Sequence, residues 1–151
     1  MKRWIFVAVI SMLAARDAPA ADRETAADWP VTGGDAGGMR HSPLRDIDRT
    51  NVGKLAVAWT YRHGDVRSGG ITADRFAKGT AFEATPIVVE NRLVFSTPFN
   101  RVIALDPEAG TELWTFDPKL DRGRRSANMF INRGVAYWRD PSATGECASR
   151  I

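Results

Sequence analysis

Two charged side chains are the best candidates for binding a polar ligand. Glu83 follows an aromatic residue, and Arg133 stands directly before a glycine. A carboxylate accepts hydrogen bonds from an N–H group, or bonds a second carboxyl group through a proton or a water molecule. A guanidinium stays charged and can meet a carboxylate with two parallel hydrogen bonds. These residue types suit a ligand with carboxylates and N–H donors, and the alternative is that both are ordinary surface residues.

Other chemistry-bearing residues are sparse. The two histidines, His41 and His63, stand alone in loop-like sequence, and we assign neither a catalytic nor a metal-binding role. The sequence has no G-x-G-x-x-G ahead of a helix, no P-loop and no G-x-S-x-G, so it does not indicate a dinucleotide, nucleotide or serine-hydrolase site. The single cysteine, Cys147, excludes a disulfide within these 151 residues. Two alternatives remain: Cys147 forms a disulfide with a cysteine outside these residues, or it is a free buried thiol.

The charge of the chain does not indicate a nucleic-acid partner. The formal net charge is +3 and the pI is about 9.4, but the basic residues are scattered. Arg122, Arg124 and Arg125 form a small cluster that we interpret as a solvated loop. A nucleic-acid surface needs a basic face with interleaved aromatic residues, which is not seen. A weak peripheral association with an anionic membrane is the other interpretation of this cluster.

The pattern of apolar residues predicts strands joined by short turns. Four consecutive strands are expected at residues 85–89, 92–97, 101–105 and 112–116, with a two-residue hairpin turn at Glu90-Asn91. We also expect a strand at 56–61, a helical turn at 50–55 and the start of a further blade at 134–138. The four consecutive strands predict one antiparallel blade.

The third and fourth of these strands are joined by a distinctive turn. Asp106-Pro107 favours a turn, because Pro restricts φ and the Asp side chain can bond nearby backbone N–H groups. Gly110 can supply the residue with positive φ that such a turn needs. The hairpin ends with Trp114, a large aromatic residue.

This hairpin resembles the tryptophan-docking motif of the quinoprotein dehydrogenases, which are eight-bladed β-propellers that bind pyrroloquinoline quinone (PQQ). Ala104, Asp106, Gly110 and Trp114 match the motif, while Ala109 replaces its usual Thr. In such a motif a flat indole stacks between a small Ala and a bare Gly peptide of neighbouring blades, and its N–H needs an acceptor. We therefore expect the tryptophans to be docking or core residues, namely Trp29, Trp59, Trp114 and Trp138.

The resemblance extends from Asp28 to the last residue, through further segments in the family's order: 28–44, 51–61, 82–89, 96–107 and 132–138. It implies an all-β fold, a partial β-propeller with about one and a half four-stranded antiparallel blades of an eight-bladed parent. Residues 21–151 would then be the amino-terminal part of a longer propeller domain. On this interpretation the 151 residues alone are expected to be inactive.

The resemblance also implies a site and a reaction. Glu83 and Arg133 match cofactor-binding positions, and Asn128 or Met129 could contact the PQQ ring where methanol and alcohol enzymes have two adjacent cysteines. The resemblance implies calcium as a second cofactor, and it implies that the calcium ligands and the catalytic Asp lie beyond Ile151. The implied activity is oxidation of a sugar or alcohol hydroxyl, with electrons passed to ubiquinone or a cytochrome. Two alternatives are a non-catalytic propeller scaffold of the outer-membrane assembly type, which binds partner proteins, and the functionless product of a disrupted gene.

The first twenty residues have the pattern of a secretory signal. Lys2 and Arg3 precede an apolar run at 4–15, and Ala18-Pro19-Ala20 is an A-x-A-like cleavage site. We expect residues 1–20 to be a signal peptide, a mature chain starting at Ala21 and a periplasmic location. A short membrane anchor is the alternative, although the run is short for a membrane span.

Overall fold

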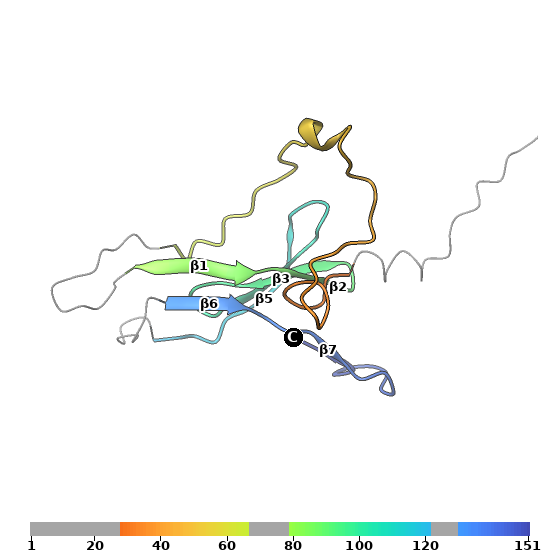
Figure 1. Cartoon of the computed structure of the whole chain (residues 1–151). Helices are drawn as coiled ribbons and strands as arrows, with labels where there is room; N and C mark the ends of the chain where they lie inside the picture. Colours follow the sequence, from red (N-terminus) through yellow and green to blue (C-terminus); the bar gives the residue numbers. More distant parts are fainter. Residues whose placement is uncertain (1–27, 67–78, 122–129) are drawn as a thin grey trace, which may run out of the picture.

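The structure is a computed structural model that describes residues 28–66, 79–121 and 130–151 (Figure 1). The expected signal peptide and the predicted ring contacts Asn128 and Met129 lie outside these ranges. Among the described residues, no helix has the length and apolar character needed to cross a membrane.

A four-stranded antiparallel sheet forms the centre of the described part and confirms the predicted blade. Its strands follow each other in chain order: β2 (Ile87–Val89), β3 (Arg92–Ser96), β4 (Val102–Leu105) and β5 (Glu112–Phe116). Glu90 and Asn91 join β2 to β3 with φ values of 49° and 56°. Two such left-handed residues match the right-handed twist of a tight hairpin.

Both faces of this sheet are covered, because alternate residues of each strand point to opposite sides. One face buries Ile87, Val89, Val94 and Ala104, against which Val135 and Tyr137 pack. The other face buries a second cluster that includes Phe95, Ile103 and Leu105 and is covered by Trp59 and Tyr61. The outermost strand, β5, is exposed along its whole length.

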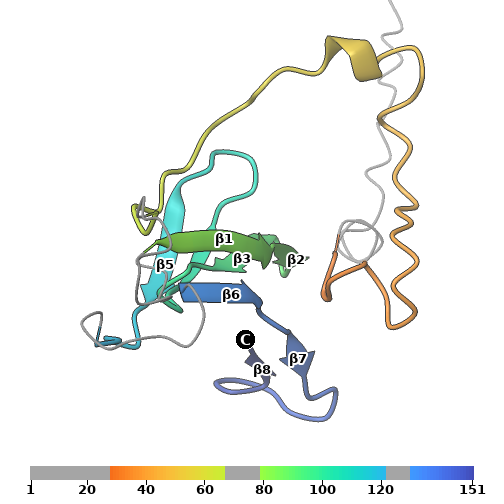
Figure 2. The ribbon, with the colours of Figure 1, turned by 60° about the vertical axis from the view of Figure 1, so that its left-hand side comes forward.

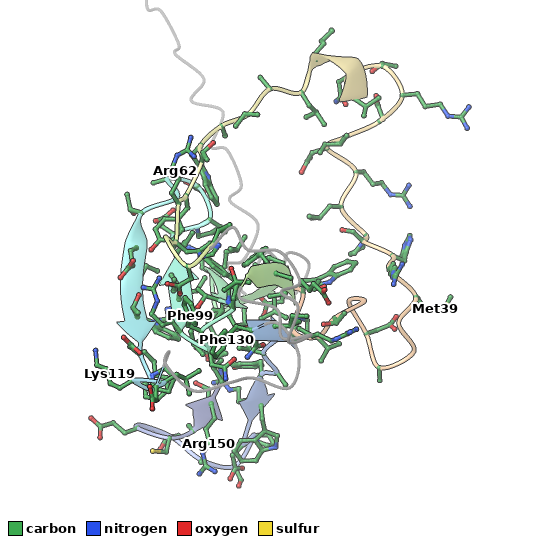
Figure 3. The ribbon with its side chains drawn as sticks, turned by 90° about the vertical axis from the view of Figure 1, so that its left-hand side faces the viewer. Met39, Arg62, Phe99, Lys119, Phe130 and Arg150 are labelled. Atoms are coloured by element: carbon green, nitrogen blue, oxygen red, sulfur yellow. The ribbon has the colours of Figure 1, made fainter. Side chains whose placement is uncertain are left out.

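A second pairing brings distant parts of the sequence together. β1 (Thr80–Thr85) lies parallel to β6 (Phe130–Gly134), with Phe82 opposite Asn132. Figures 1 and 2 show the two strands side by side, next to β3. The ring of Phe99, from the β3–β4 turn, meets the ring of Phe130 edge-on at 5.1 Å between centroids (Figure 3). This parallel pair was not predicted, because nothing local in either strand specifies a partner so far along the chain.

Two sequence predictions about strands are wrong. Residues 56–61 form no strand; they run along the sheet and contribute Trp59 and Tyr61 to its cover rather than pairing through their backbone. Residues 135–137 are also not a strand, since Val135 and Tyr137 turn onto the buried face of the sheet. The next paired segments are two residues each, β7 (Trp138–Arg139) and β8 (Ser149–Arg150).

The predicted helical turn is present as a 3₁₀ turn, η1 (Val52–Lys54). It lies at the tip of a long arm that arches away from the strands (Figure 2). Asp48 and Asn51 hold the turn through reciprocal hydrogen bonds, since the Asn51 side chain accepts from the Asp48 N–H at 2.8 Å and the Asn51 N–H donates to the Asp48 carbonyl. The arm returns to the sheet at Trp59.

Candidate functional site: the outer face of the β1–β6 pair

The two predicted binding residues are brought together by the parallel pairing. An Nη of Arg133 lies 3.6 Å from an Oε of Glu83, and their side chains are 84% and 43% exposed. At this distance the contact is an ion pair rather than a hydrogen bond. An exposed pair of this kind contributes little to stability. The guanidinium and the carboxylate therefore keep most of their bonding capacity for a ligand.

These two residues follow residues of β1 and β6 that point toward the sheet. In β1, Phe82 points toward the sheet, where its ring stacks on His63 at 5.0 Å and meets Phe95 edge-on at 5.9 Å. In β6, the opposite residue Asn132 also points toward the sheet and bonds Ser96. The register of the pair shifts just after Phe82, so that Glu83 and Ala84 together stand opposite Arg133. The ion pair shows that Glu83 and Arg133 share one side of this irregular stretch, which we call the outer face.

The inner face of the pair is rigidly built. His63 stacks on Phe82, its Nδ1 accepts from the Asp65 N–H at 3.1 Å, and burial lowers its pKa. Asp65 is 4% exposed and accepts a 2.8 Å hydrogen bond from Nε of Arg101. That bond raises the pKa of Arg101. His63 is therefore part of the support of β1.

The tryptophan-docking hairpin is present, and it receives Trp59, one of the tryptophans expected to be docking or core residues. Gly110 has φ of 68°, and Asp106 Oδ1 accepts from the backbone N–H groups of Glu108 and Ala109, as predicted for the turn. The indole of Trp59 covers Gly110 so closely that a Cβ there would lie 2.4 Å from Cδ2 of the ring. The indole N–H donates to the carbonyl of Pro107 at 3.1 Å.

Within the described residues, neither Trp114 nor Trp138 is buried, and their predicted docking against a neighbouring blade stays a prediction. Trp114 stands on the outermost strand and is 38% exposed, and Trp138 is 52% exposed beneath the guanidinium of Arg150. The position of Trp114 follows from β5 being the open side of the sheet. Trp29 does pack inward, against Gly34, and its backbone bridges to Val88.

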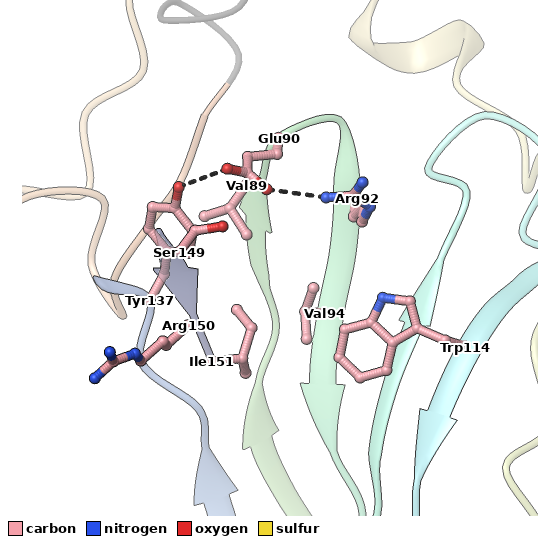
Figure 4. Close-up of a pocket in the computed structure, with 9 residues that line it drawn as sticks. All are labelled: Val89, Glu90, Arg92, Val94, Trp114, Tyr137, Ser149, Arg150 and Ile151. Carbon is pink, nitrogen blue, oxygen red and sulfur yellow. Dashed lines mark hydrogen bonds and ion pairs between the residues drawn. The ribbon is translucent and has the colours of Figure 1, made fainter. Parts of the chain in front are cut away.

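A pocket of about 340 Å³ lies on the side of the sheet that bears Trp114, away from the β1–β6 pair (Figure 4). Its polar edge is organised by Glu90, which accepts hydrogen bonds from Tyr137 at 2.9 Å and from Arg92 at 3.0 Å. Arg139 also reaches the same carboxylate, at 3.3 Å. Sequence reasoning did not identify this cluster, because its members come from separate turns and strands.

The Glu90 cluster makes stability depend on pH. The Tyr137 hydrogen bond, with smaller contributions that include Arg92, lowers the Glu90 pKa below its usual 4.5. The charged form is thus favoured by folding, so its stabilisation is complete above about pH 4.5 and is lost as the pH falls through the lower, folded pKa. Glu90→Gln is expected to reduce the free energy of unfolding at pH 7 by about 1 kcal/mol. Denaturant titrations of both proteins should converge near pH 3; a difference that persists unchanged there would contradict the assignment.

The described residues do not gather a metal site. In residues 28–66, 79–121 and 130–151, no three His, Cys, Asp or Glu side chains are close enough to hold an ion. Cys147 is exposed and free, rather than buried.

Comparison with known proteins places this fold in a family. The β-propeller domain model of the glucose/ethanol/alcohol dehydrogenases that use PQQ matches residues 29–151. The chain belongs to this family of quinoprotein dehydrogenases, and its all-β sheet is part of the family's propeller.

Individual relatives support the same conclusion. The chain is 39% identical to quinoprotein glucose dehydrogenase A of Acinetobacter calcoaceticus, over 82% of this chain and 15% of that protein. It is 34% identical to 1-butanol dehydrogenase (cytochrome c) of Thauera butanivorans, over 82% of this chain and 16% of that protein. The solved structure of quinohemoprotein alcohol dehydrogenase ADHIIG from Pseudomonas putida superposes with a TM-score of 0.58 at 36% identity, covering 78% of this chain and 15% of that one. The chain thus spans less than a fifth of the length of these relatives.

Proposed function

We propose that this chain forms part of the cofactor site of an exported quinoprotein dehydrogenase, in which Arg133 and Glu83 bind PQQ. The observation that carries the proposal is the exposed pair of opposite charges on the outer face of β1 and β6, in a chain of the PQQ family. PQQ is a planar tricarboxylate with quinone oxygens and a pyrrole N–H. Its carboxylates suit the guanidinium fork, and its N–H suits the carboxylate.

The roles of these residues are binding and orientation. When bound, PQQ supplies the two-electron acceptor for oxidation of a hydroxyl group. Arg133 would hold one PQQ carboxylate, and Glu83, which lies 3.6 Å from the guanidinium, would hold the cofactor edge. The stacked Phe82 keeps β1 in place behind them. Asn128 is proposed as a further polar contact to the cofactor.

The relatives support a proposal for the substrate and acceptor classes. This chain is similar to a glucose dehydrogenase and to a 1-butanol dehydrogenase whose name includes cytochrome c. We propose a sugar or alcohol substrate, and ubiquinone or a cytochrome as the electron acceptor. Residues 1–20 are proposed to direct export to the periplasm, where association with the inner membrane would be peripheral.

The test uses the complete polypeptide encoded by the gene, isolated from the periplasmic fraction. Mass spectrometry is expected to find Ala21 as its first residue. Added PQQ is expected to restore oxidation of glucose or primary alcohols by the cofactor-free protein, measured with an artificial electron acceptor. A protein that binds no PQQ and oxidises none of these substrates would overturn the proposal and favour the scaffold alternative. Retention of Met1 would overturn the proposed export signal.

A further inference from the structure

Asn132 occupies a position in the site that its residue type alone does not reveal. Its side-chain oxygen accepts two hydrogen bonds, one of 2.6 Å from the Ser96 hydroxyl and one of 2.9 Å from the Gly134 N–H. Its side-chain N–H donates to Oδ1 of Asn100 at 2.9 Å. Three elements therefore meet at one amide: β6, the end of β3 and the β3–β4 turn.

The bond from Gly134 closes a turn around Arg133. A side-chain oxygen that accepts from the N–H two residues ahead makes an Asx-turn, which restricts the backbone of the residue between them. Gly134 has φ of 140°, a conformation that favours glycine, and a Cβ there would lie 3.1 Å from the carbonyl oxygen of Thr85. The backbone on both sides of Arg133 is therefore restrained, although its side chain is exposed.

The bond from Ser96 ties this turn to the core. Ser96 is fully buried, so its hydroxyl is a fixed point of the central sheet. The exposed ion pair with Glu83 is too weak to orient Arg133 by itself. The backbone at Arg133 sets the direction in which its side chain leaves β6, and the Asn132 side chain connects this backbone to the sheet.

We propose that Asn132 is a positioning residue for the cofactor site: its Asx-turn, anchored on Ser96, directs Arg133 toward the PQQ carboxylate. The proposal rests on the function proposed above, because it needs Arg133 to contact PQQ. It predicts that Asn132 acts on cofactor affinity through Arg133, and not through general stability. If Asn132 had a merely structural role, its replacement would change PQQ affinity independently of whether Arg133 is present.

The experiment is a double-mutant cycle in the complete polypeptide, with the dissociation constant for PQQ measured by titration of the cofactor-free protein. Arg133→Ala is expected to weaken binding roughly tenfold to a hundredfold, and Asn132→Ala on the order of tenfold. The double variant is expected to bind within about twofold of Arg133→Ala alone, because coupled residues are not additive. Asn132→Ser, whose hydroxyl can close a weaker form of the turn, should give an intermediate affinity and replaces the alanine variant if that fails to fold.

Asn51→Ala is the matched control. Asn51 also accepts from a backbone N–H and donates to a backbone carbonyl, at 2.8 and 2.7 Å, but in the distant arm near η1. It should leave PQQ affinity unchanged, and thermal melting of all variants separates affinity from stability. If Arg133→Ala has no effect on PQQ affinity, the proposed function fails and this inference with it. If Arg133→Ala weakens binding but the two effects multiply, or Asn132→Ala binds like the wild type, the positioning role alone is overturned.

Discussion

Replacing Arg133 by alanine is expected to weaken PQQ binding by roughly tenfold to a hundredfold, with little change in stability. A charge-assisted hydrogen bond to a carboxylate contributes on the order of 1.5–3 kcal/mol, which converts to this range of affinity. The side chain is 84% exposed in the described structure, so its loss should change the free energy of unfolding by only about 0.5 kcal/mol. Titration of the cofactor-free complete polypeptide with PQQ, together with thermal melting, measures both quantities.

Three variants sharpen this test. Glu83→Gln should weaken binding in the same direction, because it removes the charge that faces the guanidinium. Arg133→Lys keeps the positive charge but not the planar fork, so an intermediate affinity is expected. Arg49→Ala is the control, since Arg49 is exposed and lies shortly before η1 in the sequence. Wild-type affinity in both Arg133→Ala and Glu83→Gln would show that this pair does not bind the cofactor.

The second large effect is expected at Gly110, where alanine should lower the free energy of unfolding by about 3–5 kcal/mol. Two costs combine there. An L-residue in the left-handed conformation costs about 1–2 kcal/mol, and φ is 68° at this position. The new Cβ would also lie 2.4 Å from the Trp59 ring, which must lift away and lose its packing and its hydrogen bond to Pro107. Loss of this half-buried aromatic contact accounts for the larger part of the estimate, about 2–3 kcal/mol.

Gly145 provides the matched control for this variant. Its φ is 84°, and a Cβ there would meet nothing within 4 Å. Gly145→Ala therefore carries the backbone cost without the collision, and denaturant unfolding of both variants isolates the contribution of the Trp59 contact. In a Trp59→Ala background, Gly110→Ala should cost no more than Gly145→Ala. Equal costs for the two glycine variants in the wild-type background would contradict the docking of Trp59 on this turn.

The blade itself could be predicted from the sequence because its signals are local. Alternating apolar residues indicate the strands, and a short turn between two of them forces antiparallel pairing. Glu90-Asn91 and Asp106-Pro107 are such turns, and the structure confirms both. Gly110 was likewise predictable, since a tight turn there needs a residue with positive φ.

The choice of docking tryptophan was not predictable in this way. Trp59 and Trp114 were both expected to be docking or core residues, and only the packing shows that Trp59 is the one that covers Gly110. The segment that carries Trp59 has the composition of a strand, but a strand exists only where a backbone partner is available. Here the neighbouring surface is a sheet face, so side chains rather than backbone groups make the contact.

The sequence by itself determined the residue types of the candidate site and, through the family resemblance, their proposed ligand. It also determined the strand order within the blade, because short connections leave few alternatives. The tertiary structure alone decided that β1 and β6 pair in parallel, which puts Glu83 beside Arg133 and Asn132 beside Ser96. The physical reason is that parallel pairing joins strands through a long connection, and neither strand carries a local signal for its partner.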